Sequence, residues 1–345
     1  MLRPIPSLAR VLLAVILGFL FLFEIPGSAQ QALILVAAGS GLPEPLYRGL
    51  NNEFSHSNPR VSVRYLPMGT EEGLKQMKQG EADLGGGDFP WSGKDLESAR
   101  GKVIQVPVAV VGIAVVCNVP GVTQELRLTG PVVADIFLGK ITKWNQPEIA
   151  KLNPGVALPN TGILLLHRTE GKGANYVLTD YLSRVSPEFK SRVGKSLSPR
   201  WVSGTSLARG EDVLFQVKDT DGAIGYVELD LAEKANVTMA HIQNAEGFYV
   251  KPSLSSLAAA AEHASPEEDS RGSILNSGGK ESYPIASFTW LYVPEREKSA
   301  ERKGVVKSYV TWLLQAGQLL IPKLGFAPLP SAVAKRAVEK LATVQ

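Results

Sequence analysis

Arg168 lies in surroundings that suit the recognition of an anion. It ends the apolar run ILLLHR (163–168), which is typical of a buried strand, and a glycine-broken turn leads from it into a helix-like segment. A guanidinium presents a planar fork of donors that matches a tetrahedral oxyanion, and the N-terminus of a helix adds unpaired N–H groups. The alternative is a solvated or salt-bridged arginine, and spacing alone leaves both open.

Asp88 is the second residue with a possible role in such a site, because it follows three consecutive glycines, Gly85 to Gly87. An aspartate in this position is most often a turn or helix-capping residue. In an anion pocket it would repel a fully deprotonated anion and accept a hydrogen bond from a protonated one. Phosphate near neutral pH still carries a proton, whereas sulfate does not, so the carboxylate would select phosphate.

Signatures of enzymes are incomplete in this sequence. EGKGAN (170–175) lacks the upstream glycine and the following Ser or Thr of a P-loop, and GTSLA (204–208) lacks the last glycine of a nucleophile elbow. The histidines have no metal-ligand spacing; they are His56, His167, His241 and His263. We therefore expect no catalytic residue, no cofactor and no bound metal.

The elements that must position Arg168 and Asp88 alternate between strand-like and helix-like runs, which predicts an α/β fold. Three strand-like runs pass through a small-residue turn directly into a helix start; they are ALILVAAGSGLPEP, RYLPMGTEEGLKQ and LLLHRTEGKGANYVL. In α/β sheets, ligands bind beyond the carboxyl ends of the strands. Thr70, at the second of these turns, is in a position to cap the helix predicted over 70–80.

The N-terminus has the pattern of a secretory signal peptide. Arg3 and Arg10 precede the apolar run 11–23, and the small residues Gly27 and Ala29 follow at the spacing of a cleavage site. The alternative is a membrane anchor, but thirteen apolar residues are short for a helix that needs about 20 to cross a bilayer. We expect cleavage near Ala29.

The net charge is only +3, and the basic residues are not gathered into a dense stripe. No nucleic-acid partner is therefore expected.

Longer motifs resemble the phosphate-binding proteins of bacterial phosphate ABC transporters, the PstS family. The resemblance covers about residues 34 to 330 with the motifs in the correct order; they include AAGSGLPEPLYRGL, LPMGTEEGLKQ, ADLGGGDFPW, YPIASFTWLYV and the nearly diagnostic LTGPVVADIFLGKITKWNQPEIAKLNPGVALP (128–159). It implies a two-lobed periplasmic binding protein fold of type II, in which each lobe is a mixed sheet flanked by helices and the ligand lies between the lobes. Residues 30–107 and 250–345 would form the first lobe, and 108–249 the second.

The resemblance also implies a set of ligand-binding residues. Thr70 stands where the family has a Ser that donates its hydroxyl and N–H to phosphate, and Asp88 where an Asp accepts the phosphate proton. Arg168 stands where an Arg pairs with phosphate. Gly173 matches a glycine that contributes its N–H, and Leu42 matches a Phe that contributes through its backbone.

The pocket departs from the family pattern at several of its side-chain donors. Gly41, Lys172 and Ala174 replace a Thr, a Ser and a Thr, so three hydroxyls are lost and one cation is gained. Glu170 replaces the Asp that orients the arginine. Lys172 has two alternatives: a direct contact of its ammonium group with the anion, or pairing with Glu170 or with the glutamates at 71 and 72.

We therefore expect an exported protein that captures inorganic phosphate and delivers it to an ABC importer. The expected partner is an ABC permease in the inner membrane, and the protein is expected to be a monomer without enzymatic activity. Two alternatives remain open. The cleft binds another oxyanion or a phosphorylated ligand, or the chain is a phosphate-responsive signalling or interaction protein that does not transport.

Overall fold

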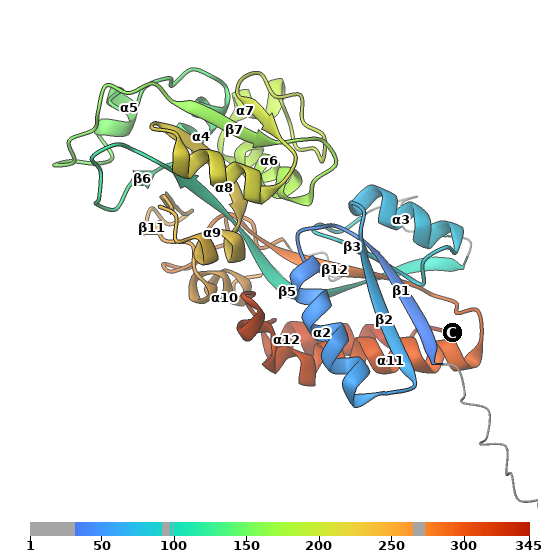
Figure 1. Ribbon diagram of the computed structural model, residues 1–345. Coiled ribbons are helices and arrows are strands. Elements are labelled where there is room, and N and C mark those ends of the chain that lie inside the picture. The colour runs from blue at the N-terminus through green and yellow to red at the C-terminus, as the bar shows by residue number, and fades with distance from the viewer. Residues whose placement is uncertain (1–31, 92–96, 99, 265–272) are drawn as a thin grey trace, which may run out of the picture.

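The computed structural model describes residues 32–91, 97–98, 100–264 and 273–345. Within these ranges nine strands form one continuous, mixed sheet, in the order β2-β1-β3-β12-β5-β9-β7-β8 with β4 beside β5. Figure 1 shows that helices gather around the two ends of this sheet, so the molecule consists of two lobes that share a central connection. The predicted α/β class and two-lobed fold are confirmed.

The first lobe is built on a sheet in which β1 pairs in parallel with β2 and β3, while β12 is antiparallel to β3. Its strands are β1 (Leu33–Gly39), β2 (Val61–Pro67), β3 (Leu84–Gly87), β12 (Ala286–Pro294) and the short β4 (Glu97–Ser98). Its helices are α2 (Glu44–Ser57), α3 (Thr70–Gln79), α11 (Ala300–Leu314) and α12 (Ser331–Leu341), with the 3-10 turns η2 (Ala316–Leu319) and η3 (Ile321–Leu324).

The second lobe contains β7 (Leu164–Arg168), which pairs in parallel with β8 (Thr205–Leu207) and β9 (Ala223–Glu228). Its helices are α4 (Gly130–Phe137), α5 (Pro147–Ala150), α6 (Gly173–Val185), α7 (Pro187–Arg192), α8 (Gly210–Asp219) and α9 (Leu229–Ala235). A separate three-stranded sheet is formed by β6 (Arg127–Leu128), β10 (His241–Gln243) and β11 (Tyr249–Val250), and α10 (Leu254–Glu262) follows it.

The long strand β5 (Gly101–Cys117) joins the two lobes. It pairs with β12 as far as Gly112 and with β9 from Ile113 onward. Every residue of β5 after Lys102 is buried, which agrees with its nearly continuous apolar sequence. The apolar run VPVAVVGIAVVCNVPG predicts a strand over 106–121, and the observed strand begins five residues earlier and ends four residues earlier.

Most strands of the first lobe lie where the apolar runs placed them. β1 and β2 match the strand-like runs ALILVAAG (32–39) and VSVRYLP (61–67). Helix α3 ends at the predicted boundary, where the left-handed backbone of Gly80 (φ 81°) closes it. The three glycines of β3 have a packing role that the sequence did not indicate. A methyl group on Gly86 would approach the hydroxyl of Tyr65 to 2.6 Å, because this ring packs directly on the strand.

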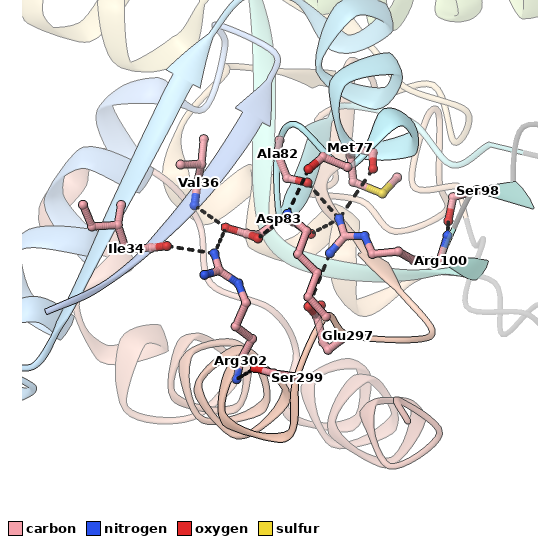
Figure 2. Close-up of polar contacts among 12 residues, drawn as sticks. Ile34, Val36, Met77, Ala82, Asp83, Ser98, Arg100, Glu297, Ser299 and Arg302 are labelled. Carbon is pink, nitrogen blue, oxygen red and sulfur yellow. Dashed lines mark hydrogen bonds and ion pairs between the residues drawn. The ribbon is translucent and has the colours of Figure 1, made fainter. Parts of the chain in front are cut away.

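A network of buried ion pairs and hydrogen bonds stabilises the first lobe on the side opposite the carboxyl ends of its strands. Figure 2 shows Asp83 accepting from the N–H of Val36 at 2.9 Å and from Nη2 of Arg302 at 2.6 Å. Arg100 donates to the carbonyls of Ala82 and Asp83 at 2.8 and 3.0 Å and pairs with Glu297 at 3.3 Å. The network therefore ties β1, β3 and the start of β5 to helix α11.

The predicted signal peptide (1–29) lies outside the described residues. In the part of the chain that the structure describes, no helix combines the length and the apolar character that crossing a membrane requires.

A candidate anion site between the lobes

A cavity of about 470 Å³ lies where strands of both lobes end. β1 ends before Ser40, β2 before the turn that leads into α3, and β7 at Arg168. The cavity wall includes six of the predicted site residues; these are Gly41, Leu42, Arg168, Lys172, Gly173 and Ala174. Thr70 and Asp88 are buried behind this wall rather than in it.

Arg168 is held in the cavity wall by an ion pair with Glu228, the last residue of β9. Nη1 donates to both carboxylate oxygens at 3.1 and 3.2 Å, and Nη2 donates to the carbonyl of Ala208 at 3.4 Å. Both side chains are about nine-tenths buried. Nε has no hydrogen-bond partner among the described residues, so one donor of the fork remains available to a ligand.

Glu170, which stands at the position of the family's orienting Asp, forms no ion pair with Arg168 among the described residues. Glu170 is exposed, whereas Glu228 forms the ion pair with Arg168. The reason is strand order: β9 lies beside β7 in the sheet, so the carboxylate at the end of β9 reaches the guanidinium at the end of β7. Glu228 lies 60 residues from Arg168 in sequence, beyond the reach of any local motif.

The backbone of Arg168 is fixed from the same side. Its N–H donates to the hydroxyl of Tyr226 at 3.0 Å, and this hydroxyl donates in turn to the side-chain oxygen of Asn175. The amide of Asn175 donates to the carbonyls of Thr169 and Leu197 at 2.7 and 3.0 Å. This buried chain of hydrogen bonds sets the turn between β7 and α6, and with it the direction in which the guanidinium leaves the strand.

Asp88 is fully buried, and neither carboxylate oxygen has a hydrogen-bond partner among the described residues. Burial raises the pKa of Asp88 to about 7. The nearby hydroxyls of Ser40 and Thr289 oppose this rise, although neither forms a hydrogen bond of normal geometry with the carboxylate, and the charge of Glu228 adds to it. An unpartnered buried carboxylate is unfavourable for stability. Its persistence here indicates a group that is completed by a ligand or by a proton.

Thr70 has the same character as Asp88. Its side chain is fully buried and its hydroxyl has no partner among the described residues. The prediction that Thr70 caps its helix is wrong, because Gly69 is the N-cap with φ 101° and Thr70 is the first helical residue. The hydroxyl is therefore not used to cap the helix.

The N-terminus of α6 forms the opposite side of the site. Asn175 and Tyr176 donate their N–H groups to the carbonyl of Lys172, whereas those of Gly173 and Ala174 have no acceptor among the described residues. Lys172 is the N-cap, is partly exposed, and its ammonium group forms no ion pair within the described ranges. The ammonium group of Lys172 is thus not engaged by an ion pair, which is compatible with the first alternative, contact with an anion.

Comparison with known proteins places this arrangement in a family. A family model described as "PBP superfamily domain" matches residues 26–316. The chain is 34% identical over 316 residues to "Phosphate-binding protein PstS" of Xylella fastidiosa, covering 90% of this chain and 86% of the relative. It is also 34% identical to the protein of that name from Pasteurella multocida, covering 91% and 92%. The chain belongs to the PstS family.

A solved structure agrees with this fold. The phosphate binding protein of Stenotrophomonas maltophilia superimposes with a TM-score of 0.68 at 21% sequence identity, covering 89% of this chain and 94% of that one. At this identity the likeness concerns the fold alone.

The hydroxyl that is missing at Gly41 has a counterpart in the adjacent residue, Ser40. Ser40, almost fully buried, lies in the cavity wall, and its oxygen accepts from the N–H of Leu42 at 3.2 Å. A methyl group on Gly173 would approach the oxygen of Ser40 to 2.9 Å, so this hydroxyl faces the N-terminus of α6. The sequence signal was available, because Ser40 follows directly after the glycine that ends the first predicted strand.

The cavity wall carries more acidic than basic side chains, but most of them are paired. Asp230 pairs with Lys234 at 3.0 Å, Glu44 with Arg48 at 3.5 Å, and Glu228 with Arg168. Arg209 lies 3.9 Å from Glu211. Among the charged wall residues that the structure describes, Glu170 and Lys172 are therefore the two that form no ion pair.

Proposed function

We propose that the protein captures inorganic phosphate in the cleft between its lobes and passes it to an ABC importer. The observation that carries this proposal is Asp88: a fully buried carboxylate with both oxygens unpartnered, set against the free N–H groups of α6. Such a group repels a fully deprotonated anion and accepts from a protonated one. Membership of a family whose relatives are named phosphate-binding proteins supports the same ligand.

Each residue of the site has a distinct task in this proposal. Asp88 accepts the phosphate proton, and Arg168 supplies positive charge through its remaining donor. Thr70 donates its free hydroxyl, and the N–H groups of Gly173 and Ala174 bind oxygens at the positive end of the α6 dipole. Gly41 and Leu42 shape the wall from the first lobe.

Lys172 takes the place of the missing hydroxyls. Its ammonium group forms no ion pair among the described residues and extends from the N-cap of the helix that faces Asp88. A charge-assisted contact with phosphate exceeds a neutral hydrogen bond in strength. We therefore favour direct contact with the anion over pairing with the glutamates at 71 and 72, of which Glu72 already accepts from Lys75 and Gln76.

The cellular role that we propose is supported by the family and by the N-terminal sequence. The protein is exported after removal of residues 1–29, acts in the periplasm or an equivalent compartment, and docks as a monomer on an inner-membrane ABC permease. Substrate binding rather than catalysis characterises the family, and we expect no turnover of phosphoesters. The division into lobes at residues 107 and 250 stays a prediction.

The size of the cavity favours a second candidate, a phosphorylated ligand larger than phosphate. A volume of about 470 Å³ exceeds the space for the five heavy atoms of phosphate, which is about 150 Å³ if each takes the share of a water molecule, roughly 30 Å³. A phosphate monoester would place its phosphoryl group at Asp88 and its substituent between Glu170 and Lys172.

The proposal is tested by calorimetric titration of residues 30–345 with phosphate, after unfolding and refolding have removed carried ligand. Saturable binding of phosphate without binding of sulfate is expected, and Asp88→Asn should allow sulfate to bind, because an amide donates to an anion without a proton. Glycerol 3-phosphate is titrated alongside, and tighter binding of this monoester than of phosphate would favour the second candidate. A cleft that binds none of these anions would refute the proposal and favour a non-transporting interaction protein.

A further inference from the structure

Two aromatic rings from different lobes stack beside the anion site. The ring of Phe89, which follows Asp88, lies on the ring of Tyr176 with the centroids 3.8 Å apart and the planes 18° from parallel. Phe89 belongs to the segment after β3 in the first lobe, and Tyr176 to the first turn of α6 in the second lobe. Neither ring lines the cavity.

The segment that carries Phe89 is held rigidly by the first lobe. The hydroxyl of Ser287 donates to the carbonyl of Asp88 at 2.8 Å, and that of Tyr292 to the carbonyl of Phe89 at 2.7 Å. The side chain of Gln105 bonds both backbone groups of Trp91, at 2.6 and 3.0 Å. These contacts fix both sides of Phe89, so the ring is presented to the second lobe in one orientation.

The partner ring is supported from the second lobe. The ammonium group of Lys195 lies 5.8 Å from the centre of the Tyr176 ring, within the range of a cation–π contact. On the other side, Trp91 packs against Phe89 with a centroid distance of 4.7 Å. The interlobe stack thus continues as a row of Trp91, Phe89, Tyr176 and Lys195 that crosses the boundary between the lobes once, at Phe89 and Tyr176.

We propose that Phe89 and Tyr176 form an aromatic latch that holds the lobes together over the bound ligand and slows its release. The inference rests on the proposed phosphate function for its ligand, but the latch itself follows from the interlobe stack. Opening the cleft separates the two rings and exposes both faces to water, whereas closure buries them again. Phe89 and Tyr176 are therefore positioning residues, which act on the ligand through the closed state.

The expected size of the effect follows from population linkage. Apparent affinity falls in proportion to the fraction of protein that can adopt the binding-competent state. Loss of one aromatic pair together with its buried area should raise the Kd for phosphate about tenfold. Because the latch closes after the anion has entered, the change should lie in the dissociation rate, with the association rate within about twofold of wild type.

The test measures phosphate binding and lobe distance in five variants. Phe89→Ala and Tyr176→Ala should each raise Kd about tenfold through koff, and the double variant should be less than additive. Tyr176→Phe keeps the ring and should bind as wild type. Phe215→Ala removes an aromatic side chain that is 68% exposed on α8 and serves as the control. Thermal unfolding confirms that each variant is folded.

Lobe distance separates failure of the latch from failure of the phosphate function. Fluorophores on Lys75→Cys in α3 and Lys190→Cys in α7 report closure by energy transfer, while the buried Cys117 stays unlabelled. Phe89→Ala should shift the phosphate-free protein toward a larger distance, and this result would support the latch even if phosphate did not bind. An unchanged distance together with a Kd within twofold of wild type would overturn the latch.

Discussion

Asp88 of the first lobe lies directly against Gly173 of the second, so closely that a methyl group on Gly173 would overlap the carboxylate oxygen Oδ2. The acid and the positive end of α6 thus meet across the cleft with no side chain between them. Only glycine allows this approach, because a methyl group on Gly173 would lie 1.6 Å from Oδ2 of the fully buried Asp88. The juxtaposition puts a proton acceptor and free N–H donors around one small volume.

Substitution of Gly173 should therefore disrupt binding. Gly173→Ala forces Asp88 and α6 apart, and we expect a loss of phosphate affinity of roughly 10- to 100-fold, which corresponds to the cost of overpacking a buried site. Gly304 is the matched control, because a methyl group there meets open space in helix α11. Calorimetry on Gly173→Ala and Gly304→Ala checks this, and equal affinities in the two variants would contradict it.

The buried acid should also give the unliganded protein a distinct pH dependence. The folded-state pKa of Asp88 is raised from 3.8 to about 7, so between these values the folded chain keeps a proton that the unfolded chain has released. The free energy of unfolding should thus fall as pH rises from about 4 to 7, by an amount on the order of 4 kcal/mol from this residue, and change little from it above pH 7. Asp88→Asn should remove this component.

Urea unfolding of both proteins at several pH values measures the component, because other titrating groups cancel in the difference between wild type and Asp88→Asn. The variant should become progressively more stable than wild type toward neutral pH. A difference that stays constant from pH 4 to 8 would show that Asp88 titrates alike in the folded and unfolded chains.

The partner of Arg168 can be identified by a paired substitution. Glu228→Gln leaves a buried guanidinium without its counter-charge and should lower the free energy of unfolding by about 3 kcal/mol. Glu170→Gln alters an exposed side chain and should change it by less than about 0.5 kcal/mol. Phosphate should raise the Tm of Glu228→Gln more than that of wild type, because the anion replaces the missing charge beside Arg168. Equal losses in both variants would argue against the ion pair.

Lys172 should contribute to affinity in a salt-dependent way. We expect Lys172→Ala to weaken phosphate binding about tenfold at low ionic strength, from the loss of a charge-assisted contact, and less at high salt. Lys151→Ala is the control, because Lys151 is exposed and does not line the cavity. Calorimetric titrations at two salt concentrations measure both. Wild-type affinity in Lys172→Ala would favour the alternative in which this lysine pairs with neighbouring glutamates.

The ionic network of the first lobe should matter for stability and not for binding. Asp83→Ala leaves Arg302 without its partner inside the lobe, and we expect a loss of about 3 kcal/mol in the free energy of unfolding. The network lies at the N-terminal side of β1 and β3, whereas the cavity lies at their carboxyl ends. Chemical denaturation and phosphate titration at a temperature where the variant is folded check both statements, and a changed Kd would refute the second.

Local sequence was sufficient to place Arg168 at the end of a buried strand. Apolar runs of this length form buried strands wherever they pack, and the turn residues that follow them are visible in the chain. Glu228 was missed because its contact with Arg168 depends on the order of the strands in the sheet, which brings β9 beside β7. The role of Thr70 was misassigned because the positive φ of Gly69 moves the helix start by one residue.

The stack of Phe89 on Tyr176 escaped prediction for the same reason as the ion pair of Arg168. Both rings stand in ordinary local surroundings, one after a turn and one in a helix, and only the closure of the two lobes brings them together. Contacts of this kind depend on the tertiary arrangement, and the residue types alone are equally compatible with core packing.

The position of the bound anion tests the central claim most directly. Arsenate has the geometry and the protonation behaviour of phosphate, and its arsenic atom can be located by anomalous diffraction from crystals of residues 30–345. We predict one strong anomalous peak between the lobes, with arsenate oxygens within hydrogen-bond distance of Asp88, the hydroxyl of Thr70, the guanidinium of Arg168 and the N–H of Gly173. A peak elsewhere, or an empty cleft at saturating arsenate, would contradict the proposed site.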